Sequence, residues 1–473
     1  MQQQEENFDL VVIGGGPAGY VGAIRAAQLG MNVACIEKNN SLGGTCLNEG
    51  CIPSKALLSV SEKYEEAKNH FGNFGIEASN VTLNLIKMLN YKDRVVQDLC
   101  KGIDGLFKKN RVKRFLGVGK IISETEVAVY FANSNNIQKI KTKNILIATG
   151  SEPIFLPGIE VDEKRIISSK SAICLESIPK TMIIIGGGYI GLELGSVWRR
   201  LGSEVTIIEY ADKIVPAIDN EIGKQLHKIL EKQGMKFLLK TKVVDAKVWN
   251  NSVNVTLQEV DNDQSLKNIT ADIVLVSVGR RPYTKDLGLE AVGIKLNKSG
   301  VIDVDSNFAT DVKNIYAVGD VIKGPMLAHK AEEEAIAAVE IMAGQAGHVN
   351  YNAIPSVIYT SPEVASVGLT EEELKKQEIV YKVGKFPFLA NSRARTIGNI
   401  DGMVKILADA RTDRILAVHI IGPDAGSLIA EVTLGIEFYG AAEDIARTCH
   451  AHPTLNESIK EAALAVAGRS INF

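Results

Sequence analysis

Two stretches of the chain share one order of apolar, glycine-rich and polar positions. Residues 9–38 run from an apolar segment through a glycine cluster and an Ala-rich segment to a second apolar run that ends at Glu37. Residues 181–210 repeat this order and end at Glu209. In both copies the first glycine lies 23 residues before the terminal acid. The pattern predicts a strand, a glycine turn, a helix and a second strand in each copy, as in a parallel α/β sheet.

The glycines of both copies have the spacing of dinucleotide-binding turns. They are Gly14, Gly16 and Gly19 in the first copy and Gly186, Gly188 and Gly191 in the second. The first glycine of such a motif allows the turn, the second lets the backbone approach a pyrophosphate, and the third permits close packing of helix on strand. Two complete copies predict two bound dinucleotides.

The strand-end acids indicate which dinucleotide binds. A carboxylate at Glu37 or Glu209 accepts hydrogen bonds from ribose hydroxyls, whereas a 2′-phosphate calls for arginine. Residues 210–213 contain no arginine, so the second site favours NAD over NADP. The alternative is that both acids belong to ordinary α/β loops.

Two cysteines five positions apart follow the first copy. Cys46 and Cys51 are surrounded by glycines, and Pro53 marks the first turn of a helix. Cys51 is expected at the N-terminus of that helix, where the helix dipole favours a thiolate and lowers a thiol pKa. The alternatives are an inert buried pair or half a zinc site, for which further ligands at suitable spacing are missing, so we predict no metal. A redox dithiol beside a dinucleotide needs FAD at the first site and NAD at the second.

Further segments complete the predicted nucleotide domains. Residues 144–150 and 272–282 are apolar strands that end in glycine turns, and residues 314–320 form another strand that ends at Asp320. Met326, Leu327, Ala328 and His329 are expected to open a helix. From about residue 354 the pattern changes to strands at 402–407 and 414–422 and helices at 427–439 and 443–448. This region is predicted to be a separate α+β domain.

Two histidines and a glutamate precede the last predicted helix. A histidine transfers protons near neutral pH, and a carboxylate on its other ring nitrogen fixes the tautomer. His452 with Glu457 is therefore a candidate acid-base pair, and His450 is expected to be packed. The alternative is that Glu457 only caps the helix, because residues 454–457 have the capping-box pattern.

Size, charge and cysteine usage limit the function classes. A chain of 473 residues is expected to form about three or four domains. A net charge of −3 with interspersed signs excludes a nucleic-acid or anionic-membrane surface. The other cysteines, Cys35, Cys100, Cys174 and Cys449, are expected to be packed as small apolar residues. The N-terminal residues show no export or presequence pattern, so a cytoplasmic protein is expected unless an organellar presequence has been removed.

These motifs resemble the dihydrolipoamide dehydrogenases of the pyridine nucleotide-disulfide oxidoreductase family. The resemblance rests on both glycine motifs, the dithiol segment 42–55, and the segments 317–320, 326–329 and 450–455, and it covers essentially the whole chain. It implies an α/β fold with two Rossmann-like dinucleotide-binding domains and a C-terminal α+β dimerisation domain. The implied boundaries are 1–150 for an FAD-binding domain, 151–279 for an NAD-binding domain, 280–350 for a central domain that completes the FAD site, and 351–473 for the interface domain.

The resemblance also implies roles. Dihydrolipoamide reduces a Cys46–Cys51 disulfide, with Cys46 as the interchange thiol and Cys51 against the flavin. His452, oriented by Glu457, acts as acid-base catalyst and reaches the dithiol from the partner subunit of a homodimer. Implied FAD contacts are Gly14, Gly16, Gly19, Glu37, Lys38, Gly44, Thr45, Cys46, Lys55, Gly117, Ala148, Thr149, Gly150, Ser151, Gly319, Asp320, Met326, Leu327, Ala328 and His329. Implied NAD contacts are Gly186, Gly188, Tyr189, Ile190, Gly191, Glu193, Glu209, Val243, Gly279 and Arg280.

The implied partner is the lipoyl-bearing acyltransferase of a 2-oxoacid dehydrogenase complex, or the lipoyl protein of the glycine cleavage system. Glutathione reductase is disfavoured because it needs basic residues where this chain has Glu209 and Tyr210. Mercuric reductase is disfavoured because the C-terminal residues contain no cysteine pair. A mainly scaffolding flavoprotein is a further alternative, and the intact dithiol and His452 argue against it.

Overall fold

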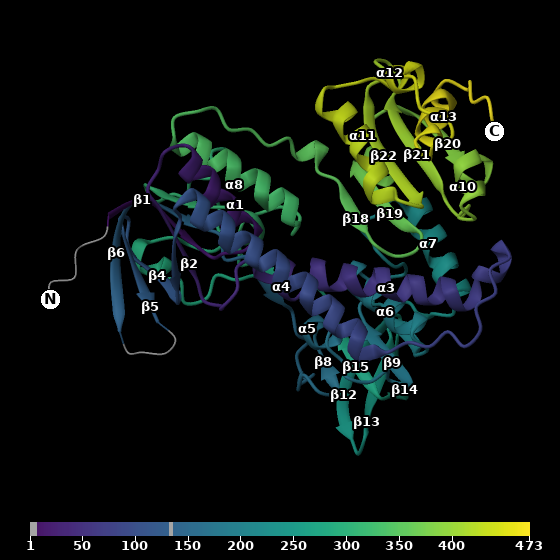
Figure 1. Cartoon of the computed structure of the whole chain (residues 1–473), viewed down its shortest axis with the longest axis horizontal. Helices are drawn as coiled ribbons and strands as arrows, with labels where there is room; N and C mark the ends of the chain where they lie inside the picture. Colours follow the sequence, from purple (N-terminus) through teal and green to yellow (C-terminus); the bar gives the residue numbers. More distant parts are fainter. Residues whose placement is uncertain (1–6, 132–135) are drawn as a thin grey trace. The chain divides into compact units, whose positions relative to one another are not determined.

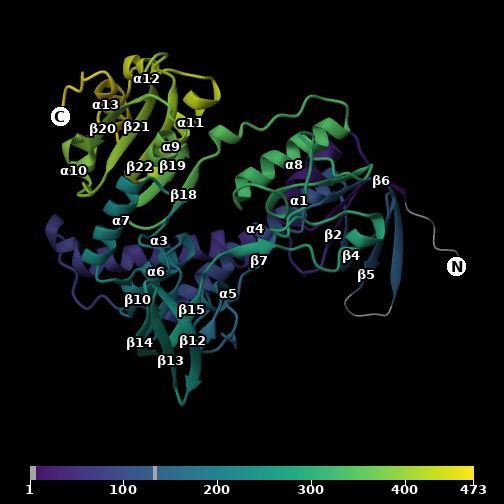
Figure 2. The same cartoon turned by 180° about the vertical axis from the view of Figure 1, so that it is seen from behind.

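The computed structural model describes residues 7–131 and 136–473, which form two compact units (Figures 1 and 2). The first unit is built from the described parts of residues 1–56, 86–154 and 279–349, and the second from residues 57–85, 155–278 and 350–473. The four domain boundaries given above stay a prediction.

The first unit contains a sheet in the order β3-β2-β1-β6-β5-β4. Its bounds are β1 Asn7–Ile13, β2 Val33–Glu37, β3 Lys113–Leu116, β4 Val118–Ser123, β5 Glu126–Tyr130 and β6 Ile137–Ile147. Strands β1, β2, β3 and β6 run parallel, and β17 (Ile315–Ala317) also pairs in parallel with the end of β6. Because β4 and β5 pair antiparallel, they extend the sheet as a meander.

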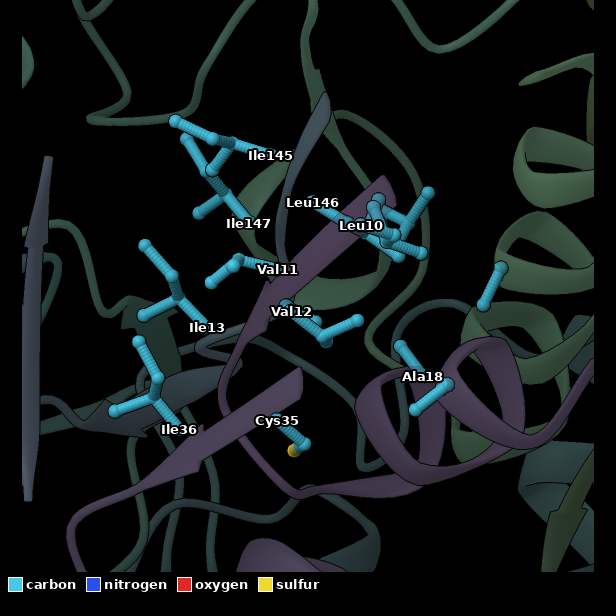
Figure 3. Close-up of a cluster of buried hydrophobic side chains, with 14 of the residues drawn as sticks. Leu10, Val11, Val12, Ile13, Ala18, Cys35, Ile36, Ile145, Leu146 and Ile147 are labelled. Carbon is cyan, nitrogen blue, oxygen red and sulfur yellow. The ribbon is translucent and has the colours of Figure 1, made fainter. Parts of the chain in front are cut away.

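The centre of this sheet is almost completely apolar. In β1, Val11, Val12 and Ile13 pair in register with residues of both β2 and β6, and all three are buried. Figure 3 shows these side chains beside Cys35 and Ile36 of β2 and residues 145–147 of β6. A continuous apolar run is typical of a parallel strand that is covered on both faces. This explains why the sequence predicts the strand β1.

Helices cover this sheet and carry the candidate site. They are α1 (Pro17–Gln28), α2 (Gly44–Asn48), α4 (Leu85–Asn110) and α8 (Ala328–Met342), with short 3-10 turns η2 (Leu289–Val292) and η3 (Gly319–Val321). Strands β7 (Ser151–Pro153) and β16 (Arg280–Pro282) pair with each other. Helix α3 (Cys51–Asn69) begins in the first unit and continues into the second.

The second unit repeats the parallel arrangement. Its first sheet has the order β11-β10-β9-β15-β8, with β8 Ile166–Ile167, β9 Thr181–Ile185, β10 Glu204–Ile208, β11 Lys236–Leu238 and β15 Ile273–Val276. Its helices are α5 (Ser169–Ala172), α6 (Tyr189–Arg200) and α7 (Asn220–Lys232), and an antiparallel sheet is formed by β12 (Thr241–Trp249), β13 (Ser252–Glu259) and β14 (Asn262–Ala271). The order β11-β10-β9-β15 matches β3-β2-β1-β6, so the internal repeat extends beyond the two glycine motifs.

The C-terminal part of the second unit is a mixed α+β layer, as the sequence predicts. Its antiparallel sheet has the order β18-β19-β22-β21-β20, with β18 Ser356–Ile358, β19 Glu363–Gly368, β20 Tyr381–Pro387, β21 Met403–Asp409 and β22 Ile415–Gly422. Its helices are α9 (Glu371–Lys376), α10 (Ser392–Thr396), α11 (Ala425–Glu437), α12 (Ala442–Arg447) and α13 (Glu457–Val466). Short 3-10 turns lie at η4 (Tyr351–Ala353) and η5 (Phe388–Ala390), and another, η1 (Phe71–Phe74), lies in the segment 57–85 of the same unit.

Candidate dithiol and dinucleotide sites

The first glycine of each motif adopts a backbone conformation that side chains disfavour. Gly14 has φ +106°, and a Cβ placed on it would lie 2.4 Å from the carbonyl oxygen of Ala148. Gly186 has φ +108°, and its Cβ would lie 2.5 Å from the carbonyl oxygen of Ser277. Both contacts are far below van der Waals distance, so each turn requires glycine.

The other glycines of the motifs also have the expected positions. A Cβ on Gly19 would lie 1.8 Å, and one on Gly191 2.3 Å, from the carbonyl oxygen of the first glycine in its own motif. Gly16 and Gly188 are the N-cap residues of α1 and α6, and no described side chain caps either helix. A Cβ on Gly188 would meet no atom within 4 Å. Both helix N-termini have uncapped amides, which suits a pyrophosphate. The space at Gly188 is open, whereas a Cβ on Gly16 would lie 3.7 Å from Gly44 Cα.

Both strand-end acids hold their glycine turns in the same way. The Glu37 carboxylate accepts the amide of Gly15 at 2.8 Å through one oxygen and that of Asn39 at 2.8 Å through the other. The corresponding amides lie 2.6 and 2.8 Å from the oxygens of Glu209. Each oxygen retains acceptor capacity for a ribose hydroxyl. The two acids thus hold the loops, as expected if they belong to ordinary α/β loops. Their oxygens can also accept hydrogen bonds from the ribose of a dinucleotide.

A polar cluster lies where β6 ends. Ser151 Oγ donates to Asp320 Oδ2 at 2.5 Å, and Arg280 Nε donates to Ser151 Oγ at 2.8 Å. Thr149 Oγ1 donates to the carbonyl oxygen of Tyr283 at 2.6 Å, and Lys38 Nζ lies 3.8 Å from the centre of the Tyr283 ring. The structure brings these predicted residues together. The resemblance implies that Arg280 contacts NAD and that Ser151 contacts FAD. In the structure these two side chains are hydrogen-bonded to each other.

A buried ion pair that the sequence analysis missed holds the turn before Asp320. Lys330 and Glu334 are both completely buried and lie 3.0 Å apart. Lys330 Nζ also donates to the Gly319 carbonyl at 3.1 Å, and the Gly319 amide donates to Glu334 Oε2 at 2.8 Å. A Lys and a Glu four positions apart on a helix are usually a solvent-exposed pair, so their spacing alone does not reveal burial.

The two cysteines lie at adjoining helix ends in the first unit. Cys46 belongs to α2, and Cys51 is the first residue of α3, which confirms the expected helix start. Their side chains are hydrogen-bonded to each other and partly buried. The hydrogen bond with Cys51 is the main cause that raises the pKa of the Cys46 thiol. Burial and the charges of Cys51 and Glu332 raise this pKa further, whereas the charge of Lys55 lowers it.

The dithiol segment lies against the first glycine motif. A Cβ on Gly44, the first residue of α2, would lie 2.6 Å from Gly16 Cα. Thr45 follows Gly44 in the same helix, and Lys55 lies just beyond the first turn of α3. The approach of α2 to the start of α1 places the dithiol segment against the first glycine motif. Its position beside a bound dinucleotide stays a prediction.

The histidine pair in the second unit differs in exposure. His452 Nδ1 lies 2.9 Å from Glu457 Oε1, and its side chain is 69% exposed. His450 Nε2 lies 2.6 Å from Glu431 Oε1, Nδ1 lies 2.9 Å from the Thr448 carbonyl, and the side chain is 5% exposed. Both nitrogens of His450 have partners in the fold. His452 is therefore the better placed of the two for proton transfer with a reactant.

Glu457 serves the helix and the histidine together. Its second oxygen accepts the Thr454 amide at 2.9 Å, and α13 begins at Glu457. Burial raises the pKa of the Glu457 carboxyl, but the Thr454 amide and His452 outweigh it, so that the pKa is lowered. The capping-box reading holds only in part, because Asn456 is the N-cap of α13 and carries no side-chain cap hydrogen bond. Glu457 does contact His452, and the acid-base role of this pair stays a prediction.

Comparison with known proteins identifies the family to which the chain belongs. A family model described as pyridine nucleotide-disulphide oxidoreductase matches residues 8–335. The chain belongs to this family. The dimerisation domain of the same family matches residues 354–463, which supports a homodimer.

Relatives in this family match almost the whole chain. The chain is 55% identical to dihydrolipoyl dehydrogenase 1, mitochondrial, of Arabidopsis thaliana, over 99% of this chain and 92% of the relative. It is 54% identical to leghemoglobin reductase of Glycine max, over 98% of this chain and 88% of the relative. The crystal structure of LpdA from Mycobacterium tuberculosis has the same fold, with a TM-score of 0.90 at 24% identity, over 97% of this chain and 99% of that one.

The cofactors of this oxidoreductase family are FAD and NAD. The residues present fit both groups, because the helix after each glycine turn begins at a glycine without a side-chain cap in the described chain, and each strand ends in an acid. Among the described residues, no cluster of His, Cys, Asp and Glu could hold a metal ion. No described helix is long and apolar enough to cross a membrane.

The remaining predicted NAD residues are spread over α6 and its neighbours. Tyr189 and Ile190 open α6, and Gly279 has φ +128°. Glu193 is buried and accepts the amide of Tyr359 at 3.0 Å. Val243 lies in β12 and is partly buried against a hydrophobic core that includes residues of β9, β13 and β15. Glu193 therefore has a structural partner within its own unit.

The remaining predicted FAD residues lie at strand and helix ends. The Gly117 amide donates to the Glu37 carbonyl at 2.9 Å. Gly150 has φ +72°. Met326 and the N-cap residue Leu327 precede α8, Ala328 is its first residue, and His329 is exposed. These positions surround the turns that the first motif and Asp320 form.

One expectation about the other cysteines is wrong. Cys35 and Cys100 are buried, as expected for small apolar residues, but Cys174 and Cys449 are exposed. Cys174 follows the short helix α5, and Cys449 lies in the loop between α12 and α13. Isolated cysteines without a strand or helix pattern around them give no reliable signal of burial.

Proposed function

We propose that the chain is a dihydrolipoamide dehydrogenase, which converts dihydrolipoamide and NAD⁺ into lipoamide, NADH and H⁺. In this reaction the substrate loses two S–H bonds and gains one S–S bond, and two electrons with one proton reach NAD⁺ while the second proton is released. The observation that carries the proposal is the hydrogen-bonded Cys46–Cys51 pair beside a glycine turn, in a chain 55% identical to a dihydrolipoyl dehydrogenase.

The cysteines would exchange disulfides with the substrate. One sulfur of dihydrolipoamide attacks Cys46 Sγ of the oxidised pair, the Cys46–Cys51 bond breaks, and Cys51 leaves as a thiolate. The second substrate sulfur then attacks the first, lipoamide is released, and Cys46 retains the electron pair. The position of Cys51 at the start of α3 favours this leaving thiolate.

His452 would take the proton from the attacking substrate thiol. Its Nδ1 is held by Glu457, so a neutral ring keeps the proton on Nδ1 and presents Nε2 as base. The side chain is 69% exposed in a single chain, whereas a base that acts on a buried disulfide must be covered. We infer that His452 of the partner subunit completes the site around each dithiol.

The cofactor assignments belong to this proposal. Bound FAD supplies two-electron transfer between sulfur and a nicotinamide. The first glycine motif, Glu37, Lys55, the cluster at residues 148–151 and Asp320 with residues 326–329 would hold FAD. The second motif, Glu209 and Gly279 would hold NAD. Glu193, Val243 and Arg280 were also assigned to NAD, but Glu193 bonds to the Tyr359 amide, Val243 packs against the core and Arg280 donates to Ser151.

The proposed protein partner carries a lipoyl group on a lysine arm, as in the acyltransferase of a 2-oxoacid dehydrogenase complex or the glycine cleavage system. This proposal is supported by the 55% identity to the Arabidopsis relative named dihydrolipoyl dehydrogenase 1. The sequence predicts a cytoplasmic location, whereas the Arabidopsis relative is named mitochondrial. Fractionation of cells with an antibody to this chain decides between the two compartments.

The test is NADH formation by the purified protein with free dihydrolipoamide and NAD. Parallel reactions contain NADP in place of NAD, or glutathione disulfide with NADPH. Rapid turnover with NAD and dihydrolipoamide supports the proposal. A protein that retains FAD and both thiols but gives no turnover contradicts it.

A second candidate activity comes from the soybean relative named leghemoglobin reductase, which is 54% identical. Reduction of a ferric globin with NADH, followed by the absorbance of the haem, is therefore a further reaction to measure. If globin reduction survives in Cys46→Ser while dihydrolipoamide oxidation is lost, the two activities use different groups of the protein.

A further inference from the structure

Asn48 lies between the two cysteines of the dithiol segment and makes contacts that no glycine motif or predicted site residue explains. Its side-chain NH₂ group donates to the carbonyl oxygen of Gly44 at 2.9 Å and to that of Leu42 at 3.1 Å. Its side-chain oxygen accepts from the Ser41 hydroxyl at 2.7 Å. One side chain thus ties the end of α2 back to the residues that precede and begin this helix.

A buried cysteine on a second helix completes this hydrogen-bond cluster. Cys100 of α4 is buried, and its thiol lies 3.3 Å from the Leu42 carbonyl oxygen and 3.6 Å from Asn48 Oδ1. A thiol is a weak donor, so Cys100 contributes mainly a fixed packing surface behind the loop. Both hydrogens of the Asn48 NH₂ group and the oxygen of its amide therefore have partners within the cluster.

The same loop is attached to the turn of the first glycine motif. The Gly43 amide donates to the Gly15 carbonyl oxygen at 2.8 Å. Leu42 is completely buried, and a Cβ on Gly15 would lie 2.6 Å from Leu42 Cδ2. Contacts this close prevent the loop and the turn from shifting relative to each other. Asn48 therefore connects the dithiol segment to the turn that would hold the first dinucleotide.

The chain between Asn48 and the two sulfurs is short on both sides. Cys46 lies two positions before Asn48, and Cys51 lies three positions after it. A Cβ on Gly50 would lie 3.1 Å from the Thr45 carbonyl oxygen and 3.6 Å from Cys46 Cα. A connection this short and close makes the start of α3, where Cys51 lies, depend on the position of α2.

We propose that Asn48 is a positioning residue that holds the two sulfurs at the separation a disulfide requires and fixes both to the first glycine turn. Its side chain exchanges no electron, proton or bond. Thiols that are held close together form a disulfide more favourably than thiols in a loose loop, because less conformational entropy is lost on closure. This inference rests on the proposed function for its biological use, since disulfide exchange is the step in which the separation matters.

The equilibrium between dithiol and disulfide tests this role in the FAD-bound protein. The protein is equilibrated under argon with mixtures of reduced and oxidised dithiothreitol, so that two electrons and two protons pass between this reagent and the Cys46–Cys51 pair. Acid stops the exchange, and N-ethylmaleimide in denaturant then blocks the free thiols. Mass spectrometry of the peptide that contains both cysteines gives the oxidised fraction. Flavin absorbance is recorded in parallel, so that electrons held by FAD are counted separately.

Asn48→Leu keeps the approximate volume of the side chain and removes its hydrogen bonds. We expect the equilibrium constant for disulfide formation to fall about tenfold, which corresponds to a reduction potential about 30 mV less negative. Ser41→Ala removes one partner of Asn48 and should lower the constant about threefold. A substitution that weakens the fold equally in both redox states leaves this constant unchanged, so a change reports on the sulfur positions. Retained FAD absorbance identifies variants that fold.

Asn144→Leu is the matched control. Asn144 is also partly buried in the first unit, and its side chain donates to the Asp9 carbonyl oxygen at 3.4 Å, where β6 pairs with Leu10. This variant should leave the constant unchanged. The proposal is overturned if Asn48→Leu leaves the constant unchanged, or if Asn144→Leu lowers it equally. If Asn48→Leu does not retain FAD, an unchanged constant in Ser41→Ala overturns the proposal instead.

The outcome is separate from that of the enzyme assay. The equilibrium measurement contains neither dihydrolipoamide nor NAD. An unmodified protein that forms the disulfide but does not turn over dihydrolipoamide contradicts the proposed function alone. An active unmodified protein with an unchanged constant in Asn48→Leu contradicts the role of Asn48 alone.

Discussion

His452 Nδ1 and Glu457 Oε1 lie 2.9 Å apart, while the other oxygen of Glu457 accepts the Thr454 amide. The carboxylate is thus fixed by the backbone and fixes the ring in turn. A histidine held at Nδ1 offers Nε2 to a reactant. This arrangement gives a direct prediction for two variants.

His452→Gln should lower kcat with dihydrolipoamide about 100-fold or more, the range of general acid-base catalysis. Glu457→Gln should lower it about tenfold or more, because an amide can present its NH₂ group to Nδ1 and select the wrong tautomer. The measurement is steady-state NADH formation. Glu431→Gln, which loses the contact with His450, is the control and should remain near the original rate.

A mixed dimer tests whether the dithiol and histidine of one site come from two chains. Cys46→Ser and His452→Gln homodimers should both be inactive and remain yellow with FAD. A purified heterodimer of the two should regain about half of the original activity, because one of its sites receives an intact dithiol from one chain and His452 from the other. If both groups came from the same chain, each site would carry one defect.

Glu209→Gln should increase the use of NADP. Removal of the carboxylate charge abolishes its repulsion of a 2′-phosphate, and the ratio of kcat/KM for NADP to that for NAD should rise about tenfold, equivalent to about 1.4 kcal/mol. The amide oxygen can still accept from the Gly187 backbone. The same substitution at Glu37, which holds the first turn, should leave this ratio unchanged and weaken FAD retention instead.

The parts of the molecule that the sequence predicts well are those with local signals. The turns at Gly14 and Gly186 follow apolar strands, and both require glycine because a Cβ would overlap a carbonyl oxygen. Cys51 was expected at a helix start because Pro53 follows it, and α3 begins at that residue. In each case a few consecutive residues determine both the backbone and the chemistry.

The parts that the sequence does not reveal are contacts between distant charged residues. Lys330 with Glu334 has the spacing of a surface pair, yet both side chains are buried and bond to the backbone of Gly319, a residue outside the helix. Tyr20 meets Glu332 only because α1 and α8 pack closely. Lysine and glutamate are rarely buried, so a sequence without a structure predicts that Lys330, Glu334 and Glu332 lie at the surface.

A further buried lysine gives the last prediction. Lys405 in β21 is 1% exposed and lies 2.6 Å from Glu371, 3.0 Å from Asp219 and 3.2 Å from Glu221. Asp219 is itself completely buried and caps α7. Lys405→Met leaves these acids without their shared cation. The free energy of unfolding of this unit, from urea titration at pH 7, should fall about 3–5 kcal/mol.

Two variants and a pH series sharpen this test. Lys385→Met, at the 44% exposed lysine that pairs with Glu221, should cost at most about 1 kcal/mol, and an equal loss for both lysines would contradict the role of the buried cation. Burial raises the pKa of Glu371, but hydrogen bonds from Lys375 and Lys405 outweigh it and lower the pKa to about 2 from the ordinary 4.5. The stabilisation by this acid is therefore complete above pH 4.5 and is lost as the pH falls toward about 2. Between these values the unmodified protein should lose stability more steeply than Lys405→Met, since the variant has already lost one of the two lysine partners that depress this carboxyl.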